Sequence, residues 1–275
     1  MITSTANAQV KELIRLMKKS RARDEAGVFL VEGPRMAGEL IGDPAWGPGI
    51  EKIYLSETYA EKHKKELAEI KSRAEVEILS DTVFAHVSDT KTPQGILAVV
   101  KRKEYGMEEI LGREPAQAHV LVLDNLQDPG NLGTIFRTAE AAGVTGVIMS
   151  RDCVDIYNPK VIRSTMGAVF RVPFLYAEDL PGTIGELKRA GLGIYAAHLK
   201  GKNAYDQEDY RKGCAFLIGN EGNGLRDEVA ECADHLVIIP MQGMAESLNA
   251  AVAAAVLMFE VSRQRRSLSV EQERG

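Results

Sequence analysis

The sequence has few of the features that mark secreted, metal-bound or membrane-spanning proteins. Its 275 residues include three cysteines, Cys153, Cys214 and Cys232, with no C-x-x-C pair and no histidine at metal-ligand spacing. This usage argues against a disulfide framework or a zinc site, and it favours a reducing cytoplasm with each cysteine a small buried hydrophobe. No signal peptide is recognisable, and the longest apolar run, Ala250–Phe259, is too short to span a bilayer. We therefore expect no membrane span and no metal.

Signature motifs of several enzyme classes are also missing. The chain has no nucleophile elbow with a Ser-His-Asp set and no H-E-x-x-H. Its glycine-rich turn lacks the G-x-G-x-x-G spacing, and no Lys-Ser or Lys-Thr pair follows it. These absences weigh against a P-loop protein. They also weigh against a nucleotide-dependent oxidoreductase on a doubly wound sheet, which would carry a glycine fingerprint after its first strand.

The chain lacks the overall excess of positive charge that is typical of proteins that coat nucleic acid, since its net charge is −5. A local excess lies in residues 1–23, where Glu12 is the only acidic residue. The basic residues there are Lys11, Arg15, Lys18, Lys19, Arg21 and Arg23. Such a cluster could neutralise RNA phosphates, with Lys18, Lys19, Arg21 and Arg23 as the candidate contacts. A solvated helix face explains the same charges equally well.

Residues 1–100 have the pattern of a compact α/β domain. Apolar residues at helical spacing, Val10, Leu13, Ile14 and Met17, predict a first amphipathic helix. Short strand-type runs follow at 28–31, 53–55, 76–79 and 95–100. Residues 101–118 have no sustained apolar period, and we interpret them as the linker to a second domain, residues 119–275.

The second domain alternates between strand-type and helix-type segments. We expect strands at 119–124, 145–149, 193–197, 215–219 and 236–239, and helices at 131–142, 158–167, 183–190, 225–232 and 246–266. This alternation predicts an α/β fold whose mostly parallel sheet has helices on both faces. Ligands of such sheets bind at the carboxyl ends of the strands. The loops after Asp124, Ala197, Gly219 and Pro240 are therefore the expected place of a functional site.

Two of these loops begin segments with candidate functional residues. In DNLQDPGNLGTIFRTAEAAG (124–143), Asn131 lies at a helix start and Arg137 follows about two turns later. Asparagine at this place is commonly a helix cap, and Arg137 could be a plain exposed cation. In FLIGNEGNGL (216–225), a strand enters a loop with three glycines, which let the backbone approach a ligand closely or form an ordinary turn.

A third segment, VIIPMQGMAESLNAAVAAAVLMFE (237–260), ends a strand at Pro240 and leads through a loop into a long helix. We expect Ser247, Leu248 and Asn249 in the first turn of that helix. The alanines that follow give a smooth flank that would allow a tight helix crossing or a subunit interface. High helix propensity explains them equally well.

In their order and spacing, the three segments resemble the motifs of the SpoU (TrmH) family of RNA methyltransferases, in the wider SPOUT class. The resemblance covers about residues 119–265 and rests on DPGNLGTIFRTAEAAG, IGNEGNGL and IPMQGMAESLNAAVAAA, with Ala250 where many relatives have Val-Ser after S-L-N. It implies transfer of a methyl group from S-adenosylmethionine to a ribose 2′-OH, a C-terminal trefoil knot, and a homodimer whose active site forms across the subunits.

The N-terminal domain is similar, more loosely, to the RNA substrate-binding domain of rRNA-modifying members, a small ribosomal-protein-like α/β fold. The similarity rests on the basic first helix, FLVEGPRMAGEL and GILAVV. It favours 23S ribosomal RNA as the substrate. Two alternatives remain: a 2′-O-methyltransferase acting on tRNA, and a non-catalytic RNA-binding or ribosome-assembly protein.

The resemblance also assigns roles to individual residues. It implies a catalytic set of Arg137, Asn131, Glu221, Ser247 and Asn249, in which the last four orient Arg137 and the ribose. It implies cofactor contacts through the backbone of Gly219, Ile239 and Leu248, in a pocket that Ala197, His198 and Met241 line. A guanidinium keeps its proton up to a pKa above about 12. The resemblance assigns Arg137 the removal of the hydroxyl proton, but a group that is already protonated could instead grip the phosphate, orient the hydroxyl, or relay its proton through RNA.

Overall fold

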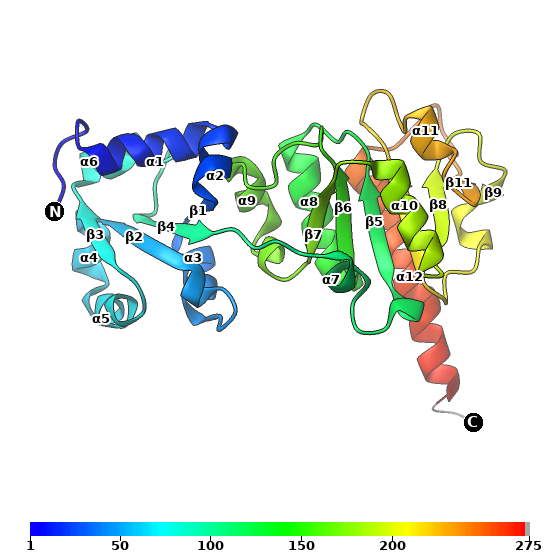
Figure 1. The fold of residues 1–275 in the computed structure, drawn as a ribbon, viewed down its shortest axis with the longest axis horizontal. Coiled ribbons are helices and arrows are strands. Elements are labelled where there is room, and N and C mark those ends of the chain that lie inside the picture. Colours follow the sequence, from blue (N-terminus) through cyan, green and yellow to red (C-terminus); the bar gives the residue numbers. More distant parts are fainter. Residues whose placement is uncertain (273–275) are drawn as a thin grey trace. The chain divides into compact units, whose positions relative to one another are not determined.

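The computed structural model describes residues 1–272. The chain forms two compact units (Figure 1). The N-terminal unit consists of residues 1–103 together with 155–170, and the C-terminal unit consists of residues 104–154 together with the chain from Arg171 onward. Residues 273–275, at the end of the predicted second domain, lie outside the described residues. Residues 155–170 thus belong by their contacts to the N-terminal unit, although the domain that precedes and follows them in sequence is the C-terminal one.

The N-terminal unit is built on a four-stranded sheet with the order β1-β4-β2-β3. Its strands are β1 (Val28–Glu32), β2 (Ile50–Ser56), β3 (Val76–Leu79) and β4 (Ile96–Lys101). β4 pairs antiparallel with β1 and β2, and β2 pairs parallel with β3. The helices are α1 (Ala8–Lys18), α2 (Ser20–Ala26), α3 (Pro34–Gly42), α4 (Glu57–Lys62), α5 (Lys64–Arg73), α6 (Asp81–Val87) and α9 (Pro159–Thr165). An apolar cluster joins α1 and α6 to one face of the sheet.

Arg23, a predicted RNA contact, is part of the core of this unit. Its residue is only 2% exposed. One end of the guanidinium donates to the carbonyl oxygen of Leu16 at 2.7 Å, and the other end forms an ion pair with Asp155. A buried and paired guanidinium has no surface to offer to a phosphate, so the prediction for Arg23 was wrong. Arg23 instead fastens the segment that begins at Asp155 to the N-terminal unit.

The C-terminal unit contains a seven-stranded sheet with the order β7-β6-β5-β10-β8-β11-β9, in which every neighbouring pair is parallel. Its strands are β5 (His119–Leu123), β6 (Gly146–Ser150), β7 (Phe174–Ala177), β8 (Gly193–Ala197), β9 (Asn203–Ala204), β10 (Cys214–Ile218) and β11 (His235–Ile238). Its helices are α7 (Met107–Leu111), α8 (Pro129–Ala142), α10 (Leu180–Arg189), α11 (Asp227–Ala230) and α12 (Ala250–Gln272).

Helices cover both faces of this sheet (Figure 1). Side chains of α7, α10 and α11 pack in one apolar cluster with Val120 and Val122 of β5. The alternate side chains of a strand point to the opposite face. On that face α12 packs along α8 and against β10. The predicted α/β fold, with a parallel sheet between two helical layers, is confirmed.

The start of α12 differs from the prediction. The helix begins at Ala250, so Ser247 and Leu248 lie in the preceding loop and not in the first helical turn. Asn249 precedes the helix, and its side-chain oxygen accepts the amides of Ala251 at 2.9 Å and Val252 at 3.3 Å. Asparagine is among the preferred N-cap residues because its side chain satisfies such amides. The cap therefore fixes the helix start four residues later than the predicted start at residue 246.

The three cysteines are free, and Cys153 and Cys214 are buried. Among residues 1–272, no helix combines the length and the apolar character needed to cross a membrane. The described part of the chain also has no group of three or more His, Cys, Asp or Glu side chains that could hold a metal ion.

Candidate active site

A pocket of about 480 Å³ lies in the C-terminal unit at the carboxyl ends of β8, β10 and β11. Its walls come from the loops that follow these three strands and from the start of α12. Cavities of roughly 300–1,000 Å³ are typical of small-molecule sites. The structure places all six predicted cofactor contacts in its lining: Ala197, His198, Gly219, Ile239, Met241 and Leu248.

Three residues that line this pocket contribute main-chain groups without a partner among residues 1–272. A Cβ atom on Gly219 would lie 2.2 Å from the backbone of Gly224 and Leu225, so the two limbs of the loop after β10 touch at this glycine. Within residues 1–272, the backbone amides and carbonyls of Gly219, Ile239 and Leu248 make no hydrogen bond. These groups therefore remain available to a ligand that has donors and acceptors of its own.

His198 is oriented by the loop after β8. Its backbone amide donates to the carbonyl of Val237 at 3.0 Å, and its Nδ1 accepts the amide of Lys200 at 3.0 Å. Because Nδ1 is an acceptor, the neutral ring carries its proton on Nε2. His198 thus presents a hydrogen-bond donor in a loop that lines the pocket.

A chain of hydrogen bonds joins the three motifs beside the pocket. The side-chain amide of Asn249 donates to Oδ1 of Asn131 at 2.9 Å. The side-chain amide of Asn131 in turn donates to Oε1 of Glu221 at 3.0 Å. Asn249 caps α12, Asn131 lies in the first turn of α8, and Glu221 lies in the loop after β10. Three of the five predicted catalytic residues are therefore in direct contact.

The donor-to-acceptor direction of these hydrogen bonds is fixed at both ends of the Asn249–Asn131–Glu221 chain. Oδ1 of Asn249 accepts backbone amides of α12, so its Nδ2 must face Asn131. Glu221 at the other end is an acceptor when ionised, and it also accepts the amides of Asp128 at 3.0 Å and Gln127 at 3.2 Å. Asn131 thus has one possible orientation, with its oxygen toward Asn249 and its amide toward Glu221.

The same contacts set the charge of Glu221. Partial burial would raise the pKa of this carboxyl, but hydrogen bonds from Asn131 and from the backbone amides of Asp128 and Gln127 outweigh it and hold the pKa below the ordinary value. Glu221 is therefore ionised at neutral pH and acts as an acceptor, not as a proton donor.

The other two predicted catalytic residues are placed differently. Ser247 lines the pocket and is exposed, and it makes no side-chain hydrogen bond within residues 1–272. Arg137 is exposed on α8, and the described residues include no hydrogen-bond or ion-pair partner for its guanidinium. The expected hydrogen bonding of Arg137 by Asn131, Glu221, Ser247 and Asn249 is thus not made among residues 1–272.

Two residues that the sequence reasoning missed shape the site. Asp128 caps α8 by accepting the amide of Asn131 at 2.7 Å, which leaves the Asn131 side chain free for Glu221. The Asp-Pro pair at 128–129 is a recognisable helix-start signal. Asn220 accepts the amides of Gly222 at 2.9 Å and Asn223 at 3.0 Å, and so folds the loop that carries Glu221.

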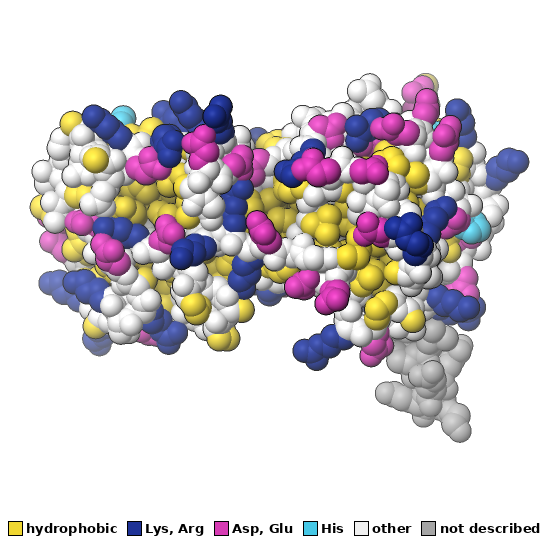
Figure 2. Space-filling model, viewed as in Figure 1, with side chains coloured by type: hydrophobic (Ala, Val, Ile, Leu, Met, Phe, Trp, Pro, Cys, Tyr) yellow, Lys and Arg dark blue, Asp and Glu magenta, His cyan; other side chains and the backbone are white. Residues whose placement is uncertain are grey.

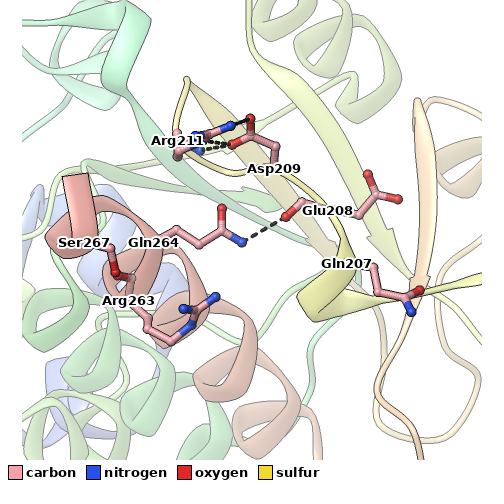
Figure 3. Close-up of a pocket in the computed structure, with 7 residues that line it drawn as sticks. All are labelled: Gln207, Glu208, Asp209, Arg211, Arg263, Gln264 and Ser267. Atoms are coloured by element: carbon pink, nitrogen blue, oxygen red, sulfur yellow. Dashed lines mark hydrogen bonds and ion pairs between the residues drawn. The ribbon is translucent and has the colours of Figure 1, made fainter. Parts of the chain in front are cut away.

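A second hollow of about 320 Å³ lies between the α12 side chains Arg263, Gln264 and Ser267 and the segment 207–211 (Figure 3). Its charges are already satisfied: Arg211 pairs with Asp209 at 2.6 Å, and Arg263 pairs with Glu260 at 2.7 Å. Gln264 donates to the carbonyl of Glu208 at 2.9 Å. These contacts hold the helix in place, and we do not regard this hollow as the functional site.

The surface of the N-terminal unit carries Lys and Arg side chains over α1 and α2, with acidic side chains among them (Figure 2). Lys18 and Lys19 are exposed and form no ion pair within the described residues. Arg21 is also exposed but pairs with Glu25 at 2.8 Å. The α1–α2 corner, defined by Lys18, Lys19 and Arg21, is therefore the exposed part of the predicted basic cluster.

Comparison with known proteins adds family matches over both units. The SpoU rRNA Methylase family matches residues 118–259, and the MRM3-like substrate binding domain matches residues 7–98. The Bacillus subtilis protein named 23S rRNA (guanosine(2553)-2′-O)-methyltransferase RlmP is 33% identical over 260 residues, which cover 94% of this chain and 98% of that protein.

Two solved structures are similar over nearly the whole chain. The AdoMet-bound rRNA methyltransferase from Sinorhizobium meliloti has a TM-score of 0.83 at 30% identity, covering 95% of this chain and 97% of that one. The SpoU methyltransferase AviRb from Streptomyces viridochromogenes, in complex with the cofactor AdoMet, has a TM-score of 0.83 at 27% identity, covering 95% and 99%.

Proposed function

Because the chain belongs to the SpoU rRNA methylase family, we propose that it transfers the methyl group of S-adenosylmethionine to a ribose 2′-oxygen of ribosomal RNA. The observation that carries the proposal is the hydrogen-bonded chain Asn249–Asn131–Glu221 beside the pocket at the ends of β8, β10 and β11. It joins all three family motifs into one polar cluster.

The pocket fits the cofactor. The unpaired main-chain groups of Gly219, Ile239 and Leu248 would hold its adenine and ribose portions. The contact of Gly219 with the backbone of Gly224 forms a cradle that a side chain would fill. His198 would donate from Nε2 at the rim. When bound, the cofactor supplies an electrophilic methyl group on a sulfonium.

The residues of this chain position the nucleophilic 2′-hydroxyl. Orientation of the hydroxyl by groups in a fixed geometry can supply several kcal/mol of the barrier, on the order of 7–11 in the best cases. The Asn249–Asn131–Glu221 chain is such a fixed geometry, and Ser247 adds an exposed hydroxyl at the pocket lining. The guanidinium of Arg137 would bind the RNA phosphate or orient the hydroxyl, because at neutral pH it is already protonated and offers only hydrogen-bond donors.

We propose a homodimer as the working form. Val252 and Phe259 on α12 are 49% and 44% exposed although both are apolar. Residues seven apart lie on one face of a helix, so the two side chains form an uncovered apolar stripe, the 252/259 stripe. A second copy of the chain packed on this stripe would cover it. The same packing would offer Arg137 partners that it does not have among residues 1–272 of one copy.

Ribosomal RNA is the favoured substrate because the match to a substrate-binding domain covers most of the N-terminal unit. The full-length similarity to a protein named as a 23S rRNA methyltransferase supports the same assignment. Free thiols at all three cysteines are consistent with action in the cytoplasm.

The test is methyl transfer from labelled S-adenosylmethionine to total RNA that is then separated into ribosomal and transfer RNA, with Arg137→Ala beside the wild type. We expect label in the ribosomal fraction, and its loss in Arg137→Ala with cofactor affinity retained. Label in transfer RNA alone would reassign the substrate. No label in either fraction, with unmodified transcripts as well as native RNA, would favour a non-catalytic RNA-binding role.

A further inference from the structure

A fully buried carboxylate lies beneath the loop that carries Glu221. Asp124 follows β5 directly and is 0% exposed. Arg226 neutralises it with three donors: its backbone amide reaches Oδ2 at 2.9 Å, its Nε reaches Oδ1 at 2.8 Å, and its Nη2 also contacts Oδ1. A buried charge is tolerated only when it is paired and hydrogen-bonded. The fold must therefore keep Arg226 where its donors reach the buried carboxylate of Asp124.

This pair holds the returning limb of the loop 219–225. Leu225, which lines the pocket, directly precedes Arg226. The backbone of Gly224 and Leu225 is the surface against which Gly219 rests. Neither Asp124 nor Arg226 lines the pocket. Any effect of the pair on a bound ligand must therefore pass through the loop.

The outgoing limb of the loop 219–225 is fixed to Asn125, the residue that follows Asp124. The side-chain amide of Asn220 donates to the carbonyl of Asn125 at 2.8 Å, and Asn125 donates its own amide to the hydroxyl of Ser150 at 2.8 Å. The same hydroxyl contacts Asp152, which lies 3.4 Å from Nη1 of Arg226. The two limbs are thus tied to consecutive residues, and the ties close into one polar network.

We propose that Asp124 and Arg226 are positioning residues that hold the loop 219–225 in the shape that binds the cofactor and presents Glu221. The identity of the bound ligand rests on the function proposed above. The shape of the loop does not, and it can be measured without a ligand.

The guanidinium fork is the property that matters. Two guanidinium donors, Nε and Nη2, converge on Oδ1 of Asp124, and a lysine would keep the charge but not this pair of donors. Arg226→Lys is therefore the informative variant, because its side chain is 42% exposed and the change leaves Asp124 a cationic partner. Arg211→Lys is the matched control. Arg211 contacts Asp209 with Nε at 2.8 Å and Nη2 at 2.6 Å, next to the second hollow and away from the pocket lining (Figure 3).

Two measurements on the full-length protein test the proposal. Amide hydrogen exchange without cofactor should be faster at Gly222–Leu225 in Arg226→Lys, by about tenfold, which corresponds to the loss of one charge-assisted hydrogen bond. Calorimetry should show S-adenosylmethionine binding weakened by about tenfold for the same reason. Arg211→Lys should change neither. If the melting temperature of Arg226→Lys falls far below that of the control, Asp124→Asn, which keeps the shape of the acceptor, takes its place.

The outcomes separate this proposal from the proposed function. Faster exchange in the loop with weaker binding supports it. Unchanged exchange, or unchanged binding despite faster exchange, overturns the positioning role even when the wild type binds S-adenosylmethionine. A wild type that binds no S-adenosylmethionine contradicts the proposed function, while the exchange measurement still decides whether Arg226 shapes the loop.

Discussion

The side-chain amide of Asn249 lies 2.9 Å from the side-chain oxygen of Asn131, across 118 positions of sequence. This bond joins the cap of α12 to the first turn of α8, and Asn131 passes the connection on to Glu221. Motifs that are distant in sequence thus meet because parallel strands bring their following loops to one edge of the sheet. The proposed methyl transfer depends on this contact among the three motifs.

Replacing Glu221 with glutamine should disable the site without unfolding the protein. A glutamine amide would face the donors of Asp128, Gln127 and Asn131, so at least one of these hydrogen bonds is lost. We expect turnover to fall by at least about tenfold, the effect of roughly 1.4 kcal/mol. Steady-state methylation assays check this. Glu178→Gln, on an exposed carboxylate paired with Arg151, is the matched control.

The lowered pKa of Glu221 predicts that the stability difference between wild type and Glu221→Gln depends on pH. The stabilisation that its ionised form provides is fully present above the unfolded value of about 4.3, and it is lost as pH falls through the lower folded value. The difference in unfolding free energy between wild type and Glu221→Gln should therefore narrow from about pH 5 to pH 3. Urea titrations at each pH measure it. A difference in unfolding free energy that stays constant through this pH range would show that the charge of the carboxylate does not stabilise the fold.

Gly219→Ala should weaken cofactor binding strongly. The new methyl group would lie 2.2 Å from the backbone of Gly224 and Leu225, a distance that forces the loop limbs apart. We expect the affinity for S-adenosylmethionine to fall by at least about a hundredfold, or 2.8 kcal/mol. Calorimetry checks the result. Gly185→Ala on α10, where the nearest atom to a Cβ is 3.5 Å away, should bind as the wild type does.

The α1–α2 corner should contribute electrostatic affinity for RNA. Lys18→Gln with Lys19→Gln removes two exposed cations that have no ion-pair partner among residues 1–272. The slope of log K against log salt should decrease in magnitude by up to about 1.8, since each lost phosphate contact accounts for roughly 0.7–0.9. Filter binding at several salt concentrations measures it. The same double change at Lys65 and Lys71 on α5 controls for net charge, and a slope equal to that control would make the corner a solvated surface.

The 252/259 stripe should be a subunit interface. Burying an unpaired charge in an apolar interface costs free energy, so Phe259→Arg should prevent dimer formation. We expect this variant to be a monomer of 30.1 kDa and the wild type to have twice that mass. Light scattering coupled to size exclusion measures this. Met166→Arg, on an exposed methionine of the N-terminal unit, is the control. A wild type that is already monomeric at micromolar concentration would refute the dimer.

The pocket itself was accessible from sequence. Apolar runs of strand length alternating with helical segments predict a parallel sheet, and the loops at its carboxyl ends then follow from topology. Residues of the loops after Ala197, Gly219 and Pro240 line the pocket, as this reasoning predicts, whereas the individual contacts at Gly219, Ile239 and Leu248 came from the resemblance to the SpoU family.

Side-chain pairings over long sequence distances were not accessible. Arg23 reads as one of a run of exposed cations, and nothing near it indicates a partner 132 positions away at Asp155. The pairing of Asp124 with Arg226 spans 102 positions, and each residue alone is an unremarkable charge at a strand end or helix start. The start of α12 was within reach, because Asn249 is a preferred N-cap, but Ser247 offers an equally good cap in sequence.

The most direct test of the proposed chemistry is the position of the methyl group on the product. Ribosomal RNA labelled by the wild-type protein would be digested with alkali, which cleaves a linkage only where the ribose 2′-hydroxyl is free. We predict that the label remains in an alkali-resistant dinucleotide and that Arg137→Ala produces none. Label released in mononucleotides would place the methyl group on a base and contradict ribose 2′-O-methylation.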